Sequence, residues 1–137
     1  MDGTLEAIDP NTVTAPLRDS QAFSGLSSND IPRTKAFYAE TLGLDVTDAN
    51  GMLTLNLAGG NKVIIYPKPN HAPASFTVLN FPVTQIDQVV DSLARSGVRF
   101  EQYDGMHQDD RGIQRGQGPA IAWFKDPAGN ILSVIEG

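Results

Sequence analysis

The chain has 137 residues, the size of one compact domain, of which 40% are hydrophobic and 19% are charged. These proportions exclude a disordered, fibrous or coiled-coil protein. The absence of cysteine excludes disulfides, thiolate metal sites and a cysteine nucleophile, and a net charge of -6 disfavours binding to nucleic acid or to anionic membranes.

Residues 1–20 form a polar segment rich in Thr, Asp and Pro. They lack the basic start and the apolar stretch of a secretory signal. The chain as a whole has no apolar run of roughly 18 residues, the length needed to span a bilayer. We therefore expect a loosely ordered arm over residues 1–20 and a cytoplasmic protein that does not bind membranes.

The first half of the chain predicts a strand, a helix and three further strands. The apolar segment 22–26 predicts the leading strand, and Asn29 and Asp30 can cap the helix that follows. That helix runs to about Leu42 and ends at Gly43, because helices commonly end with a glycine in the left-handed backbone conformation. The three strands are predicted at residues 44–46, 52–57 and 62–66, with an Asn-Gly turn before the second.

The second half repeats this order of elements. Residues 76–83 predict the leading strand, and Thr84 can cap a helix whose apolar stripe begins at Ile86 and which ends at Gly97. Ile31 and Ile86, at the two helix starts, are 55 positions apart, and Gly43 and Gly97, at the two helix ends, are 54 positions apart, so the two units match to within one residue. Three strands are predicted to follow, at residues 98–103, 120–124 and 131–135.

The repetition predicts an α+β fold of two tandem βαβββ modules, residues 21–68 and 74–137. The linker, residues 67–74, contains three prolines that indicate irregular backbone. Residues 104–118 are rich in glycine and aspartate and are longer than a hairpin needs. We expect either a lid over a pocket or a solvated loop there.

Several short motifs carry a resemblance to a known family. They are Asn29-Asp30-Ile31, Ala36-Phe37-Tyr38, Leu42-Gly43-Leu44, Leu93-Ala94-Arg95-Ser96-Gly97-Val98 and Phe124-Lys125-Asp126-Pro127-Ala128-Gly129-Asn130. With the repeat, they resemble the vicinal oxygen chelate superfamily of glyoxalases, bleomycin-resistance proteins, fosfomycin-resistance proteins and extradiol dioxygenases over about residues 21–136. The resemblance implies curled mixed sheets, each with a helix on its outer face, around a cup-shaped cavity for a small molecule, and it is weakly specific for activity.

The resemblance also implies three positions that hold a divalent metal ion in the family's enzymes, through two His or similar ligands and a Glu. In this chain the three positions carry Phe23, Val78 and Ser133. A phenyl ring and an isopropyl group have no lone pair to donate, and a lone hydroxyl is a poor ligand for a divalent cation. We therefore predict no metal site and no cofactor.

Alternation along the strands extends this set to the residues that line the cup. It places Gly25 and Ser27 beside Phe23, and Asn80 beside Val78. Aromatic walls are expected on two further strands. The predicted ligand-binding residues are Phe23, Gly25, Tyr66, Val78, Asn80, Trp123 and Ser133. The alternative is that Phe23, Val78 and Trp123 only fill the core.

Few residues remain as candidates for catalysis. His71 lies in the linker and His107 in the long loop, and both are expected to be solvated loop histidines. Ser24 and Ser27 have no histidine in the local sequence that could activate them. The sequence therefore gives little support for nucleophilic serine chemistry.

These residues favour a metal-free superfamily member that binds a small molecule in an apolar cup. The resemblance implies a homodimer, as in the superfamily's drug-binding members. The alternatives are a metal-dependent lyase or dioxygenase that uses other ligands, a scaffold with a filled cup, or a metal-free isomerase. The isomerase would use Tyr66, Asp104 or His107 as acid or base. Whether the chain is an enzyme stays open at this point.

Overall fold

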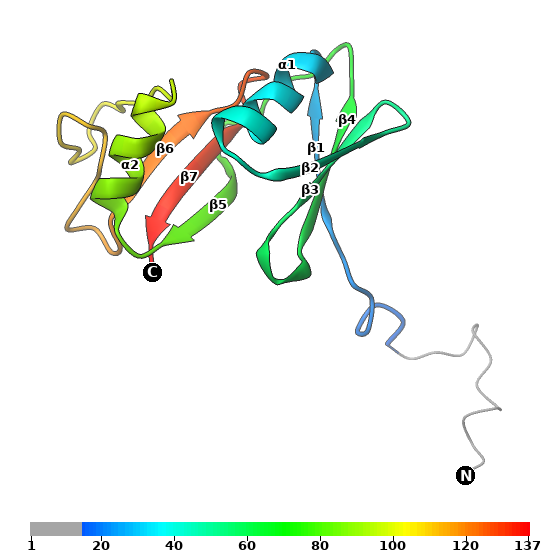
Figure 1. Ribbon diagram of the computed structural model, residues 1–137. Coiled ribbons are helices and arrows are strands. Elements are labelled where there is room, and N and C mark those ends of the chain that lie inside the picture. The colour runs from blue at the N-terminus through cyan, green and yellow to red at the C-terminus, as the bar shows by residue number, and fades with distance from the viewer. Residues whose placement is uncertain (1–14) are drawn as a thin grey trace, which may run out of the picture.

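The computed structural model describes residues 15–137 and contains two mixed β-sheets, each with a helical segment against one face (Figure 1). The first sheet has the strand order β1-β4-β3-β2, and the second has the order β5-β7-β6. The strands are β1 (Ser24–Ser28), β2 (Asp45–Ala49), β3 (Met52–Asn56), β4 (Lys62–Pro67), β5 (Thr77–Val83), β6 (Ile121–Lys125) and β7 (Ile131–Glu136). The predicted α+β architecture of two tandem units is confirmed. Most of the predicted N-terminal arm, residues 1–14, lies outside the described residues.

The first sheet follows the predicted pattern closely. β1 runs parallel to β4, and β2, β3 and β4 are antiparallel neighbours. The turn between β2 and β3 has Asn50 at φ 58° and Gly51 at φ 76°, as the Asn-Gly pair predicts. A short 3-10 turn, Ala58–Gly60, precedes β4. β1 begins two residues later than predicted, because its pairing with β4 starts at Ser24.

The first helical segment changes geometry halfway along. α1 (Ile31–Ala36) is capped by Asp30, whose carboxylate accepts a backbone hydrogen bond from the first turn at 3.1 Å. It continues as the π-helical turn η3 (Phe37–Thr41), in which the Leu42 N–H bonds to a carbonyl five residues back. Gly43 follows at φ 72°, which confirms the predicted end of the helix. The regular α-helix predicted up to Leu42 is therefore replaced in its second half by a wider turn.

The second sheet has three strands where the sequence predicts four. Residues 98–103 form no strand. They contribute only an isolated bridge between Phe100 and Phe124 and one bond from the Glu101 N–H to the Trp123 carbonyl. Two segments pair with the outer edge of β6. Phe100 pairs near the end of β6, and Gln114 of the long loop pairs with its first residue. The prediction of a full strand at 98–103 was therefore wrong.

The second helix, α2 (Ile86–Arg95), begins without the cap that the sequence predicts. Its N-cap residue is Gln85, whose side chain accepts no hydrogen bond from the free N–H groups of the first turn. The carboxylate of Glu136, at the end of β7, accepts a bond from the Ile86 N–H at 3.2 Å. A carboxylate at a helix N-terminus is favourable. The prediction of a Thr84 cap was wrong because a residue 50 positions along the chain takes this role.

The long loop, residues 104–118, is held against the second module at its centre. Ile113 is buried, and the Arg111 guanidinium forms ion pairs with Asp87 and Asp91 of α2. Gln108 donates hydrogen bonds to the carbonyls of Glu101 and Gly112 at 2.8 Å. Residues 112–114 are buried, and the exposed residues are Asp110 and the two ends, 104–107 and 115–118, so the loop is anchored at its centre and solvated at its ends.

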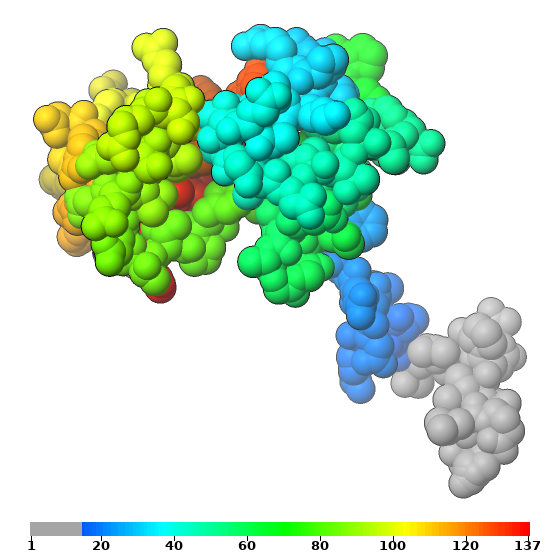
Figure 2. Space-filling model, viewed as in Figure 1, coloured from blue at the N-terminus to red at the C-terminus, as the bar shows by residue number. Residues whose placement is uncertain are grey.

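One hydrophobic core joins the two modules. It contains Tyr38, Leu53, Leu55, Val63, Ile65, Ile86, Val90, Val98, Ile113, Ala122, Phe124, Leu132 and Val134. Between the two lobes of the space-filling view, β7 is visible at the bottom of a depression (Figure 2). This position matches an apolar groove of about 150 Å³ lined by residues of both modules. No helix within residues 15–137 is long and apolar enough to cross a bilayer.

Candidate functional site

The second sheet brings four of the predicted site residues together. Asn80, Ser133 and Trp123 lie side by side on β5, β7 and β6, because Ser133 is in register with both of the others. The Ser133 side chain is fully buried, and its hydroxyl donates a hydrogen bond to the Asn80 side-chain oxygen. Val78 lies on the same sheet, at an irregularity in the pairing of β5 with β7.

An aromatic hollow lies at one end of this sheet. Its volume is about 410 Å³, and its lining residues are Ser75, Phe76, Thr77, Tyr103, Asp104, Met106, Trp123 and Ile131. The rings of Tyr103 and Trp123 meet edge to face, with centroids 5.7 Å apart. The Trp123 indole N–H donates to the Thr77 hydroxyl at 3.1 Å, which fixes the plane of the ring. Phe76 is 66% exposed and stands at the rim.

Tyr103, one of the residues that line this hollow, has a hydroxyl without a hydrogen-bond partner in the described chain. Its hydroxyl is buried and has no hydrogen-bond partner within residues 15–137. Burial raises the pKa of the Tyr103 phenol, and the negative charge of Glu101 raises it further. The hydroxyl is therefore protonated at neutral pH and is a hydrogen-bond donor without an acceptor in residues 15–137. The sequence analysis did not single out Tyr103, although an aromatic residue at the end of segment 98–103, just before the long loop, was a usable signal.

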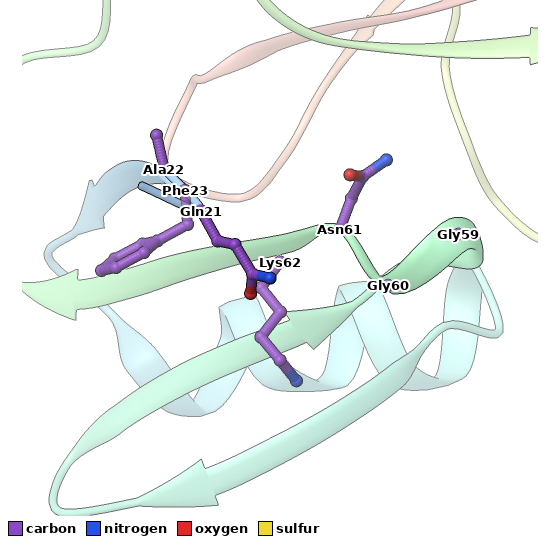
Figure 3. A pocket seen from close by; sticks show the side chains of 7 residues that line it. All are labelled: Gln21, Ala22, Phe23, Gly59, Gly60, Asn61 and Lys62. Carbon is purple, nitrogen blue, oxygen red and sulfur yellow. The ribbon is translucent and has the colours of Figure 1, made fainter. Parts of the chain in front are cut away.

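The other three predicted residues lie on the first sheet or directly before it. Phe23 precedes β1 and is 68% exposed, and Tyr66 on β4 is exposed as well. Gly25 lies next to Tyr66, since a Cβ atom placed on Gly25 would lie 3.9 Å from the Tyr66 ring. Phe23 also lines a hollow of about 480 Å³ between the N-terminal segment and the turn before β4 (Figure 3). Gln21, Ala22, Gly59, Gly60, Asn61 and Lys62 complete its lining.

Within residues 15–137, the two hollows that contain predicted residues are separate. The hollow at Phe23 and the hollow at Trp123 share no lining residue. Each group of predicted residues lies on the sheet of its own module or directly before it. Phe23 is exposed and Trp123 is half-buried, so neither is a fully buried core side chain.

His71 occupies a different environment from the one predicted. It is half-buried, with Nδ1 2.6 Å from the Ser27 hydroxyl and Nε2 3.0 Å from the Ala128 carbonyl oxygen. The prediction of a solvated histidine was wrong because the linker folds back over β1. The two partners are 44 and 57 positions away, so no local motif could have revealed them. His107 is exposed, as predicted.

The residues at the family's metal positions do not fit a divalent ion. Phe23 and Val78 offer no donor atom, and the Ser133 hydroxyl is already bonded to Asn80. Elsewhere within residues 15–137, no three His, Cys, Asp or Glu side chains are grouped so that they could hold a metal. The Asp109 side chain of the long loop accepts bonds from the N–H groups of Arg111 and Ile113 and so stabilises a turn.

Comparison with known proteins agrees with this fold. The family model described as Glyoxalase/Bleomycin resistance protein/Dioxygenase superfamily matches residues 22–134. No curated protein matches the chain.

Solved structures resemble the chain at low sequence identity. A glyoxalase family protein from Enterococcus faecalis superposes with a TM-score of 0.65 at 24% identity, covering 88% of this chain and 99% of that one. The antibiotic-binding protein TnmS3 of Streptomyces gives 0.65 at 22% identity, over 86% and 97% of the two chains. The fosfomycin resistance protein FosX of Listeria monocytogenes gives 0.66 at 14% identity, over 87% and 93%. At these identities the likeness shows the fold alone.

Proposed function

Since the chain belongs to the glyoxalase/bleomycin resistance protein/dioxygenase superfamily, we propose that it binds a small molecule in the aromatic hollow of its second module without a metal ion. One observation carries the proposal. Trp123, Tyr103 and Phe76 surround an open volume of about 410 Å³ beside a buried hydroxyl that has no partner in the described chain. Small-molecule sites commonly combine apolar walls with a few polar groups in this way.

The lining indicates the chemical class of the ligand. Aromatic walls favour a flat, conjugated molecule, and the Tyr103 hydroxyl favours a ligand that can accept a hydrogen bond. Asp104 adds an exposed carboxylate to the lining, and the chain has a net charge of -6. Both charges favour a neutral or cationic ligand over an anionic one. The antibiotic-binding protein from Streptomyces, which has the same fold, supports a small molecule as the ligand.

We also propose that two copies of the chain form a homodimer in which the two groups of site residues meet. Large apolar side chains stand exposed on or beside both sheets, with Phe23 68%, Tyr66 43% and Phe76 66% exposed. A symmetric pair that places the first sheet of one copy against the second sheet of the other covers all three. It also joins Phe23, Gly25 and Tyr66 with Val78, Asn80, Trp123 and Ser133. The cytoplasm is the compartment we propose, since a chain without cysteine fits reducing conditions.

The binding proposal can be tested through the chain's own fluorescence. Trp123 is the only tryptophan, so its emission reports directly on the hollow. We expect ethidium, a flat aromatic cation, to quench this emission in a saturable way, and the flat anion 1-anilinonaphthalene-8-sulfonate to bind more weakly. Substitution of Trp123 by Leu should weaken ethidium binding in calorimetry, whereas substitution of the exposed Leu17 should leave it unchanged. Equal binding of ethidium by both variants would contradict the proposed location.

Metal content is an independent test. Protein purified without chelator and then dialysed should retain well below one equivalent of zinc, iron or nickel. Retention of about one equivalent per chain would overturn the metal-free proposal and favour a lyase or dioxygenase with unforeseen ligands.

A further inference from the structure

Ser27 and His71 form a hydrogen-bonded pair on the first sheet. The Ser27 Oγ lies 2.6 Å from Nδ1 of His71, and Nε2 of His71 lies 3.0 Å from the carbonyl oxygen of Ala128. Both side chains are half-buried. Neither residue lines the aromatic hollow of the second module.

The partners of the ring fix its protonation pattern. A carbonyl oxygen can only accept, so Nε2 of His71 must carry the proton that is donated to Ala128. In the neutral ring Nδ1 is then the unprotonated nitrogen, and it accepts the hydroxyl proton of Ser27. A serine hydroxyl that donates to a basic nitrogen, with the ring oriented by a third group, is the arrangement that activates a nucleophile.

The serine hydroxyl lies on the side of the sheet away from the helix. The neighbouring Ser28 is fully buried and bonds to Thr34 of α1, so Ser27 faces the opposite way. Its partner in register on β4 is the exposed Tyr66. Gly25, two residues earlier on the same face, has no side chain, and the Tyr66 ring lies beside it. Ser27 is half-buried on this face, which is the face that the proposed dimer turns toward its inner cup, so we infer that a small molecule reaches Ser27 from that cup.

We propose that Ser27 is a nucleophile activated by His71 and that the pair hydrolyses small carboxylic esters. Ser27 Oγ forms a bond to the ester carbonyl carbon while its proton moves to Nδ1 of His71. The C–O bond to the alcohol then breaks, and the leaving oxygen takes that proton. Water attacks the acyl group and gives a proton to Nδ1. The acid is released as Ser27 recovers its proton. The Ala128 carbonyl stabilises the charged ring between these steps.

The experiment uses the full chain and two probes. Diisopropyl fluorophosphate should modify Ser27 in preference to every other serine, as mapped by mass spectrometry of peptides. The chain should also hydrolyse p-nitrophenyl acetate, and Ser27→Ala should remove both reactions. His71→Asn keeps a polar group near the place of Nδ1 but cannot take up the proton, so we expect the labelling rate to fall about a hundredfold.

Ser24→Ala is the matched control, since Ser24 lies on the same strand and is exposed. It should leave labelling and hydrolysis unchanged. Peptide mapping of the unsubstituted chain compares Ser27 with Ser24 directly and does not depend on how the variants fold. The proposal is wrong if Ser27 reacts no faster than Ser24, or if a folded His71→Asn chain is labelled at the original rate. The pair would then be a structural link between the linker and the two modules.

Discussion

The Tyr38 hydroxyl donates a hydrogen bond of 2.7 Å to Oδ2 of Asp126, and this bond joins the helical segment of the first module to the β6–β7 turn of the second. Both side chains are buried. The other carboxylate oxygen of Asp126 accepts bonds from the N–H groups of Ala128 and Asn130 at 2.9 Å. A buried carboxylate with this many donors is well satisfied, so the loss of one donor leaves a buried charge partly unpaired.

Substitution of Tyr38 by Phe should therefore destabilise the chain. We expect the free energy of unfolding to fall by about 2 kcal/mol, because the ring still fills its place but Oδ2 of Asp126 loses its hydroxyl partner. Urea denaturation followed by Trp123 fluorescence measures the change. Tyr66→Phe is the control, since Tyr66 is 43% exposed, and its effect should stay within about 0.5 kcal/mol. Equal effects of the two substitutions would show that the bond to Asp126 contributes nothing.

The same bond predicts how stability depends on pH in alkaline solution. Burial raises the pKa of the Tyr38 phenol far above its ordinary value, and the adjacent Asp126 carboxylate raises it further. Above pH about 10 the unfolded chain loses the Tyr38 proton and the folded chain keeps it. The contribution of Tyr38 is therefore complete below that pH and decreases as the pH rises, by about 1.4 kcal/mol per pH unit. The free energy of unfolding should fall with pH more steeply in the original chain than in Tyr38→Phe, and the difference in slope should approach one proton by about pH 11. Denaturation curves from pH 9 to 11 measure it.

Local patterns were sufficient for most of the fold. The Asn50-Gly51 turn, the left-handed ends at Gly43 and Gly97, and the alternation in β3 and β6 depend on neighbours a few residues away, and all are present in the structure. The prediction of a fourth strand in the second sheet was wrong because that strand depends on contacts outside its own segment. Whether residues 98–103 pair along their whole length depends on competition with Gln114 for the same edge of β6, and alternation within the segment carries no information on that competition.

The candidate site was predictable only in part. The position of the family's third metal ligand selected Ser133, strand alternation added Asn80, and Trp123 was predicted as an aromatic wall on a further strand. The structure places these three residues side by side. His71 was missed because its partners come from β1 and from the β6–β7 turn, and a single sequence does not reveal contacts across such separations. Glu136 replaced Thr84 at the start of α2 for the same reason.

Substitution of Tyr103 by Phe should have the opposite effect on stability from that of Tyr38→Phe. The Tyr103 hydroxyl is buried without a partner in the described chain, so its removal takes away a desolvation cost and should raise the free energy of unfolding by about 1 kcal/mol. The same change should leave ethidium binding within about twofold, because the conjugated amines of ethidium donate hydrogen bonds and do not accept them. Urea denaturation and calorimetry measure the two effects. A loss of stability would mean that the hydroxyl has a partner in the folded protein.

Substitution of Phe23 by Asp should separate the proposed dimer into single chains. Phe23 stands 68% exposed beside the first sheet, and the proposed pairing buries it against the second sheet of the other copy. A carboxylate at that place would be buried without a partner, and the free-energy cost of burying it exceeds the free energy that the dimer contact contributes. Sedimentation equilibrium should give twice the 14.7 kDa chain mass for the original protein and the single mass for Phe23→Asp. Leu17→Asp places the same charge on another exposed apolar residue, which lies before β1 and outside both sheets, and should leave the dimer intact. A single-chain mass for the original protein, or a double mass for Phe23→Asp, would show that the two sheets are not covered in this way.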